Sequence, residues 1–151
     1  MRAVLAEAAA LRHRALGLAA EDAKAYGAVT QAYALPRETD AQKQARTEEI
    51  QRAFVAATEV PLDTAMVAAD IIRLTRRIVD CANVNALADL AAATASARAA
   101  LEGALISVEA NLAAITDRHR SNEFAERMTA LAPLAAEAAR TVAGIRSKLA
   151  R

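Results

Sequence analysis

The stretch that decides the fold spans residues 22 to 61 and has the sequence DAKAYGAVTQAYALPRETDAQKQARTEEIQRAFVAATEVP. Its middle contains a strong helix stop, because Pro36 fixes its own backbone and disfavours a helical conformation in Leu35. Thr39 is followed three residues later by Gln42, the spacing of a capping box in which each side chain hydrogen-bonds the other's backbone. The stretch therefore predicts two helices joined by a short turn.

The composition extends this helical prediction to the whole chain. Among 151 residues there are 44 alanines, 4 glycines, 3 prolines and no tryptophan. Alanine has the highest intrinsic helix propensity, and a chain of this length supports one hydrophobic core. We expect a single all-α domain over residues 1–151, folded as an antiparallel bundle of about five helices. The predicted ranges are 2–35, 40–58, 61–80, 85–117 and 122–149.

Two prolines help to place these boundaries. Pro61 suits the first turn of the third helix, where its missing N–H costs nothing. Pro133 is expected to bend the last helix, because its ring removes a backbone donor and crowds the preceding turn.

Charge and cysteine content exclude several classes of protein. The 19 basic and 18 acidic side chains give a net charge of +1 and form no long block, so we expect no nucleic-acid partner. No uninterrupted apolar stretch reaches membrane-spanning length and no signal-peptide pattern is present, so we expect no membrane partner and a cytoplasmic location. Cys81, the single cysteine, is interpreted as a small core residue.

Asp22 interrupts an apolar stripe on the first predicted helix and is expected to point inward with it. A partly buried carboxylate paired with an arginine of another helix explains Asp22 as well as a ligand site does. Tyr26 and Tyr33 are expected in the core, although an aromatic face beside a pocket also suits a flat heterocycle. The stripe follows steps of three or four residues, at Val4, Ala8, Leu11, Ala15, Leu18, Asp22, Tyr26, Val29 and Tyr33.

The fourth predicted helix has two uncharged faces. One is apolar and contains Leu87, Leu90, Thr94, Leu101, Leu105, Val108, Leu112 and Ile115. The opposite face is small or polar and contains Asn85, Asp89, Ser96, Ala100, Gly103 and Ser107. A helix of this kind is expected to be covered on both sides, which favours self-association, and Asp89 with the neutral polar groups can line a cleft. Asp89 is alternatively a stabilising charge at the amino-terminal end of its helix.

The cations and histidines give weaker indications of a functional site. Arg37, Lys43 and Arg46 surround the turn after Pro36, where they form either a solvated helix end or a clamp for a ligand carboxylate. The histidines, at positions 13 and 119, have no partner at metal-ligand spacing, so we expect no metal.

With these residues in view, the chain resembles the formimidoyltetrahydrofolate cyclodeaminase and methenyltetrahydrofolate cyclohydrolase family. The resemblance covers essentially the whole chain and depends on the order and spacing of short motifs. These are D-x-x-A-Y from Asp22, A-Y-x-L-P-R from Ala32, Arg46 before Ile50 and Gln51, and A-T-E-V-P from Ala57. They continue with N-x-N-x-x-x-D at Asn83, Asn85 and Asp89, and with Asn111, Leu112, Ile115 and Asp117.

The resemblance implies a helical homodimer that acts on a reduced folate. The reaction is hydrolysis of 5,10-methenyltetrahydrofolate to 10-formyltetrahydrofolate or cyclising deamination of 5-formimidoyltetrahydrofolate. Hydrolysis is preferred because no formimidoyltransferase domain is attached. Asp22 and Asp89 are the expected catalytic pair, one stabilising the cationic methenyl carbon and one moving a proton. Substrate binding is expected from Tyr26, Arg37, Asn83, Asn85 and Asn111, with Arg37 on the glutamate tail and no separate cofactor.

Three departures from the family pattern support a rival hypothesis. Ala82 stands where the family usually has glycine, and Ala88 where it has serine before the aspartate. The family's amino-terminal helix and Pro-Gly-Gly-Gly segment are not in this sequence, so either the start of the protein lies upstream of Met1 or the domain is amino-terminally shortened. The rival is therefore a non-catalytic helical homologue that binds a partner or an altered ligand.

Overall fold

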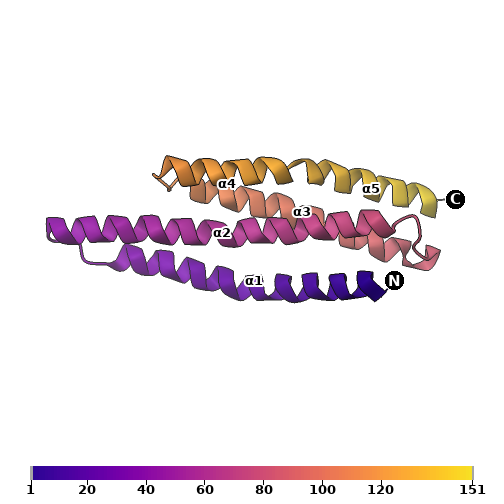
Figure 1. Ribbon diagram of the computed structural model, residues 1–151, viewed down its shortest axis with the longest axis horizontal. Coiled ribbons are helices and arrows are strands. Elements are labelled where there is room, and N and C mark those ends of the chain that lie inside the picture. The colour runs from indigo at the N-terminus through magenta and orange to yellow at the C-terminus, as the bar shows by residue number, and fades with distance from the viewer. Residues whose placement is uncertain (1, 151) are drawn as a thin grey trace.

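The computed structural model describes residues 2–150, and every regular element in that range is a helix (Figure 1). The helices run antiparallel, and α4 and α5 follow one another along one rod (Figure 1). This confirms the all-α prediction. The elements are α1 (Arg2–Ala34), α2 (Asp40–Ile78), the short 3₁₀ helix η1 (Val84–Ala86), α3 (Leu87–Leu112), α4 (Arg118–Leu131) and α5 (Pro133–Leu149).

The turn between α1 and α2 forms as the sequence predicts. Thr39 is the N-cap of α2, its side chain accepts a hydrogen bond from the Gln42 backbone, and the Gln42 side chain accepts one from the Thr39 backbone. Arg46 closes the other side, because its guanidinium donates to the Tyr33 carbonyl oxygen near the end of α1 and lies 5.5 Å from the Tyr33 ring. A cation at a helix carboxyl end satisfies free carbonyls and complements the helix dipole.

The predicted break between residues 58 and 61 is wrong, because α2 continues through Pro61. A proline inside a helix leaves the carbonyl four residues earlier, here that of Ala57, without its usual donor. The Asn111 side-chain amide donates to this Ala57 oxygen at 3.2 Å. A residue of α3 therefore replaces the missing hydrogen bond, and a tertiary contact keeps the helix continuous.

The predicted last helix is also divided differently. α4 begins at Arg118, where the Asp117 side chain caps it by accepting from the His119 and Arg120 backbones. The rod is then interrupted at Ala132, and Pro133 occupies the first turn of α5, the position where a missing N–H is tolerated.

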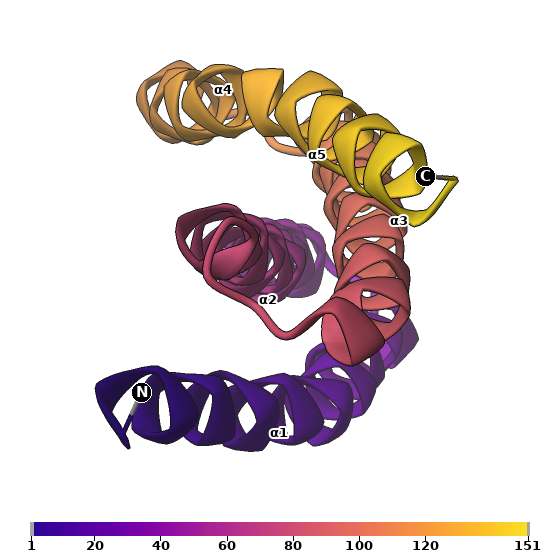
Figure 2. The same ribbon diagram turned by 90° about the vertical axis from the view of Figure 1, so that its right-hand side faces the viewer.

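The core lies among α2, α3, α4 and α5. Its largest fully buried side chains include Phe124, Leu62 and Ile72. Viewed end-on, α1, α3 and the α4–α5 rod form an arc around α2 (Figure 2). The predicted apolar face of α3 is confirmed, since Leu101 and Val108 are completely buried. α1 supplies no residue to the core cluster and packs mainly on α2.

This peripheral position explains two corrections in α1. Only Leu18 and Ala32 are fully buried there, so most of the predicted stripe is not core. Tyr26 and Tyr33 are 74% and 51% exposed, against the prediction that both are core residues. Each helix face needs a neighbouring element to be buried, and within the described chain the Tyr26 side of α1 has none.

Cys81 is exposed in the turn after α2, so its interpretation as a core residue is also wrong. Among the described helices none is both long and apolar enough to cross a membrane.

Candidate functional site

A groove with Asp22 on its wall lies where α1, α2 and α3 approach one another. Its volume is about 390 Å³, and we call it the Asp22 groove. α1 contributes Ala15, Leu18, Ala19 and Asp22, α2 contributes Pro61 and Thr64, and α3 contributes Ala100, Gly103, Ala104 and Ser107. The three segments are far apart in sequence, so the groove exists only in the folded chain.

The groove is open because its α3 wall is built from small side chains. A Cβ atom added to Gly103 meets nothing within 4 Å, so this position has free space beside it. The Ser107 hydroxyl donates to the Gly103 carbonyl and the Thr64 hydroxyl donates to the Val60 carbonyl. Both hydroxyls are therefore held close to their own helices, and each keeps an oxygen that can accept a hydrogen bond from a ligand.

Asp22 is the only titratable side chain among the residues that line the groove. It is exposed, and within residues 2–150 it forms neither a hydrogen bond nor an ion pair. The interpretation of Asp22 as a buried half of a structural ion pair is therefore wrong. Its carboxylate is available to a ligand in the groove.

An ion pair beside the groove fixes α1 against α2. The Arg14 guanidinium contacts the carboxylate of Asp63 at 2.5 Å and that of Glu21 at the same distance. The hydrogen bonds to Glu21 and Asp63 raise the pKa of Arg14 above its ordinary value. Asp63 lies between the floor residues Pro61 and Thr64, so this contact joins the α1 wall to the groove floor. No sequence pattern distinguished Arg14 from the other arginines of the chain.

Asp89 does not join Asp22 within one chain. It lies in the first turn of α3, eighteen residues before Ser107, which is about 27 Å of helix. Asn83 and Asn85 lie at the same end, where the Asn83 side chain caps η1 by accepting from the Asn85 backbone at 2.9 Å. The three residues form a second polar group at the other end of the exposed α3 face.

The remaining residues that were predicted to bind substrate differ in whether they already have a protein partner. Tyr26 lies about one turn beyond Asp22 on α1 and is exposed. Lys43 pairs with Asp40 at 2.8 Å, whereas Arg37 forms no ion pair or side-chain hydrogen bond within the described chain. Arg37 is thus the cation near the turn that has no protein partner within the described chain.

Asn111 already has a protein partner, because its side-chain amide donates to the Ala57 carbonyl. Substrate binding by Asn111 stays a prediction.

A motif residue that sequence reasoning left without a role, Gln51, has a structural one. Its amide donates to the Ala114 carbonyl at 2.9 Å, and its oxygen accepts from the backbone and hydroxyl of Thr116 at 2.8 and 2.9 Å. This fastens the turn between α3 and α4 to α2. Gln51 and Asn111 therefore both have architectural roles in this fold.

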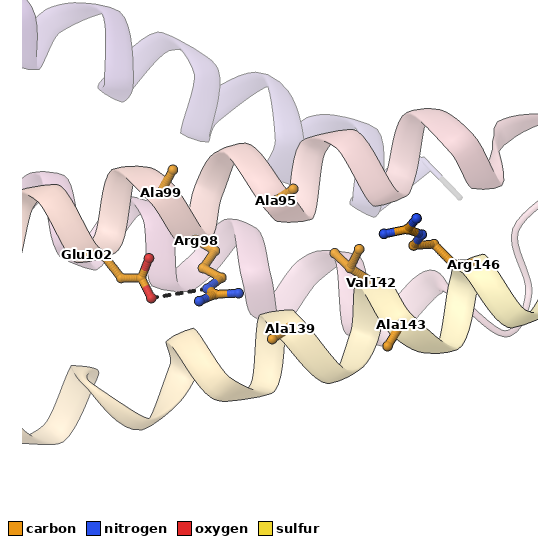
Figure 3. Close-up of a pocket in the computed structure, with 8 residues that line it drawn as sticks. All are labelled: Ala95, Arg98, Ala99, Glu102, Ala139, Val142, Ala143 and Arg146. Atoms are coloured by element: carbon orange, nitrogen blue, oxygen red, sulfur yellow. Dashed lines mark hydrogen bonds and ion pairs between the residues drawn. The ribbon is translucent and has the colours of Figure 1, made fainter.

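A second groove lies on the opposite side of α3, against α5 (Figure 3). We call it the α3–α5 groove; its volume is about 420 Å³. It is floored by alanines and Val142, with Arg98 and Arg146 toward its two ends (Figure 3). Arg98 donates to Glu102 at 3.1 Å, so its charge is already paired. In the described chain no three His, Cys, Asp or Glu side chains gather into a metal-binding group.

Comparisons with known proteins agree with the motif resemblance. A family model described as formiminotransferase-cyclodeaminase matches residues 1–130. A methenyltetrahydrofolate cyclohydrolase from Methylorubrum extorquens is 36% identical over 138 residues, which cover 91% of this chain and 65% of that protein. A crystal structure of formiminotetrahydrofolate cyclodeaminase from Thermotoga maritima matches with a TM-score of 0.79 at 20% identity, over 93% of this chain and 66% of that one. The chain thus spans just under two thirds of each relative's length.

Proposed function

The chain belongs to the formiminotransferase-cyclodeaminase family, and on that basis we propose that it hydrolyses 5,10-methenyltetrahydrofolate to 10-formyltetrahydrofolate. The observation that carries the proposal is the 36% identity to a methenyltetrahydrofolate cyclohydrolase over 91% of this chain. The likeness to the cyclodeaminase structure supports the fold. The Asp22 groove supplies a site with an unpaired carboxylate beside the small-residue wall of α3.

The proposed reaction needs charge stabilisation and proton transfer. The methenyl carbon bridges N5 and N10 and shares a positive charge with them. Water forms a C–O bond to that carbon and loses one proton, which gives a neutral tetrahedral carbon bearing a hydroxyl group. The C–N5 bond then breaks with its electron pair going to N5, which takes up a proton, while the hydroxyl loses its proton and becomes the formyl oxygen. One water is consumed and one proton is released overall.

Asp22 is suited to the first step of this reaction. A carboxylate next to the cationic methenyl carbon stabilises the bound substrate, and the same group can accept the proton of the attacking water. Walls made of Ala15, Ala19 and Gly103 leave room for a flat ring system beside Asp22. We therefore assign Asp22 as the acid–base group of the groove.

Other residues are assigned to the rest of the substrate. Tyr26 offers an aromatic face about one turn from Asp22, which suits stacking on a heterocycle. Arg37 follows the carboxyl end of α1, whose last residue lies about 18 Å along the helix from Asp22. An elongated ligand that starts at Asp22 can reach this end, where the guanidinium binds a carboxylate through paired hydrogen bonds.

The proposal includes a cytoplasmic homodimer that needs no metal or redox cofactor. The exposed face of α3 between Asp89 and Ser107 carries small side chains, which suits contact with a second copy. Water is the second reactant and folate is the substrate, so the chemistry requires neither oxidation nor reduction.

A direct assay with product identification tests the proposed function. Purified full-length chain is expected to accelerate loss of the methenyl chromophore above the spontaneous rate and to form 10-formyltetrahydrofolate. Ammonia release from 5-formimidoyltetrahydrofolate, without faster hydrolysis of the methenyl substrate, would instead identify a cyclodeaminase. A folded protein with neither activity would support the non-catalytic alternative.

A further inference from the structure

The wall that carries Asp22 depends on α2 for its position. α1 supplies no residue to the buried core cluster and packs mainly on α2. Of the α1 residues that line the Asp22 groove, only Leu18 is buried, and two of the others are alanines. Alanine side chains fix a helix weakly against its neighbour, because each buries little apolar surface. A polar contact between α1 and α2 at this level therefore has a large share in setting where Asp22 lies.

Arg14 makes such a contact with both ends of its guanidinium group. Nη2 lies 2.5 Å from a carboxylate oxygen of Asp63 on α2, and Nη1 lies 2.5 Å from one of Glu21 on α1. Asp63 directly precedes the floor residue Thr64, and Glu21 directly precedes Asp22 on the wall. The guanidinium is planar and rigid, so it fixes the two carboxylates relative to one another. One side chain thus ties the wall of the groove to its floor.

The contact within α1 also determines where the Glu21 carboxylate lies. Arg14 and Glu21 are seven residues apart, about 10.5 Å along the helix axis, so both side chains extend along the helix surface to meet. Oε1 of Glu21 lies 3.8 Å from the place that a Cβ atom of Gly17 would take, which is back along α1 toward Arg14. Glu21 is therefore occupied by Arg14, and Asp22 is the carboxylate that lines the groove.

We propose that Arg14 is a positioning residue, which holds α1 on α2 so that the Asp22 carboxylate lies where the hydrolysis needs it. The inference rests on the proposed cyclohydrolase function. Arg14 does not line the groove, so it acts on the reaction through the position of α1 and not by touching the substrate. Catalytic geometry tolerates little error, because a displacement of about 1 Å can slow a reaction by about 100-fold.

The chain contains a matched ion pair that joins the same two helices elsewhere. Arg77 of α2 donates to both carboxylate oxygens of Glu7 of α1, at 3.2 and 2.6 Å. The hydrogen bonds to Glu7 raise the pKa of Arg77, as those to Glu21 and Asp63 raise the pKa of Arg14. Glu7 precedes Asp22 by about 22 Å of helix, whereas Arg14 precedes it by about 12 Å. The two pairs therefore differ mainly in their distance from the groove.

Steady-state kinetics of full-length variants test the positioning role. Arg14→Gln is expected to lower kcat about tenfold while KM stays within about twofold, because the substrate does not contact Arg14. Asp63→Asn is expected to give the same loss, and the double variant to lose no more, since both changes break one contact. Arg14→Lys keeps a cation for Asp63 and is expected to recover most of kcat. The control, Arg77→Gln, is expected to keep both constants.

The outcomes separate this inference from the proposed function. If wild type hydrolyses the methenyl substrate and Arg14→Gln loses no more kcat than Arg77→Gln, Arg14 has no positioning role and the proposed function stands. A change in KM alone would mean that Arg14 binds the substrate directly, which also overturns the inference.

Hydrogen–deuterium exchange tests the contact without any folate chemistry. The backbone amides of residues 15–26 are expected to exchange several-fold faster in Arg14→Gln than in wild type, because this part of α1 opens from α2 more often. Arg77→Gln is expected to leave that segment unchanged and to raise exchange around Glu7. Unchanged exchange of residues 15–26 in the Arg14→Gln protein would overturn the inference even if the wild-type chain proves inactive.

Discussion

The two grooves on either side of α3 have almost the same size and different chemistry. The Asp22 groove has a volume of about 390 Å³ and the α3–α5 groove about 420 Å³. The larger groove contains three charged side chains, of which Arg98 and Glu102 already neutralise each other. The smaller contains one charge, Asp22, which has no partner in the described chain. Within the described chain the charge without a partner is therefore a carboxylate, Asp22, in the smaller groove and a guanidinium, Arg146, in the larger one, and the proposed reaction needs the carboxylate.

Neutralising one carboxylate in each groove is expected to give the largest difference in kcat between the two grooves. Asp22→Asn is expected to lower kcat by about 100-fold or more, since a positioned acid–base group contributes about 10² to 10⁴. Glu102→Gln removes the corresponding charge from the α3–α5 groove and is expected to leave kcat unchanged. The measurement is steady-state loss of the methenyl chromophore, with circular dichroism confirming that both variants are folded. Equal losses in the two variants would show that the grooves cannot be told apart by charge.

Filling each groove with a larger side chain gives the next largest effect. Ala19→Leu places an isobutyl group in the Asp22 groove from α1, and kcat/KM is expected to fall about tenfold or more because the substrate is displaced. Ala143→Leu does the same in the α3–α5 groove and is expected to have little effect. Both alanines are exposed, and leucine is a good helix former, so neither change should unfold the chain. Unimpaired turnover by the Ala19→Leu protein would move the site elsewhere.

Replacing Arg37 and Arg146 compares the two grooves at the substrate-binding step. Arg37→Gln is expected to raise KM about tenfold with little change in kcat, because a charge-assisted hydrogen bond contributes about 1.5 to 3 kcal/mol. Arg146→Gln, in the α3–α5 groove, is expected to leave both constants unchanged. A substrate analogue without its terminal carboxylate should bind wild type and the Arg37→Gln protein equally. A remaining difference with that analogue would assign Arg37 another role.

The sequence was sufficient for the features that depend on local chemistry. The capping box at Thr39 and Gln42 involves neighbouring residues, so its geometry follows from the residues themselves. The buried face of α3 follows from apolar periodicity, which requires only that something covers it. The small, uncharged wall that α3 gives to the Asp22 groove was visible in the same way, as the face opposite the buried one.

Features that depend on distant neighbours were not predictable. Tyr26 lies on an apolar stripe, but nothing in the described chain covers that side of α1, so it is exposed. Pro61 indicates a helix boundary when only its own segment is considered. The donor that keeps α2 continuous comes from Asn111, far along the chain in another helix, and no local pattern connects the two.

The smallest predicted effect tests the contact between Asn111 and Ala57, which supports α2 beside Pro61 in the Asp22 groove. Asn111→Ala leaves the Ala57 carbonyl without a donor and is expected to destabilise the fold by about 1 kcal/mol, measured by urea unfolding. In a Pro61→Ala background the backbone regains an N–H at position 61 that can donate to Ala57, so the same Asn111→Ala change should cost less. A coupling of about 0.5 kcal/mol or more between the two positions is expected because both act on one acceptor. Additive effects would mean that Asn111 stabilises α2 by some means other than replacing the hydrogen bond that proline removes.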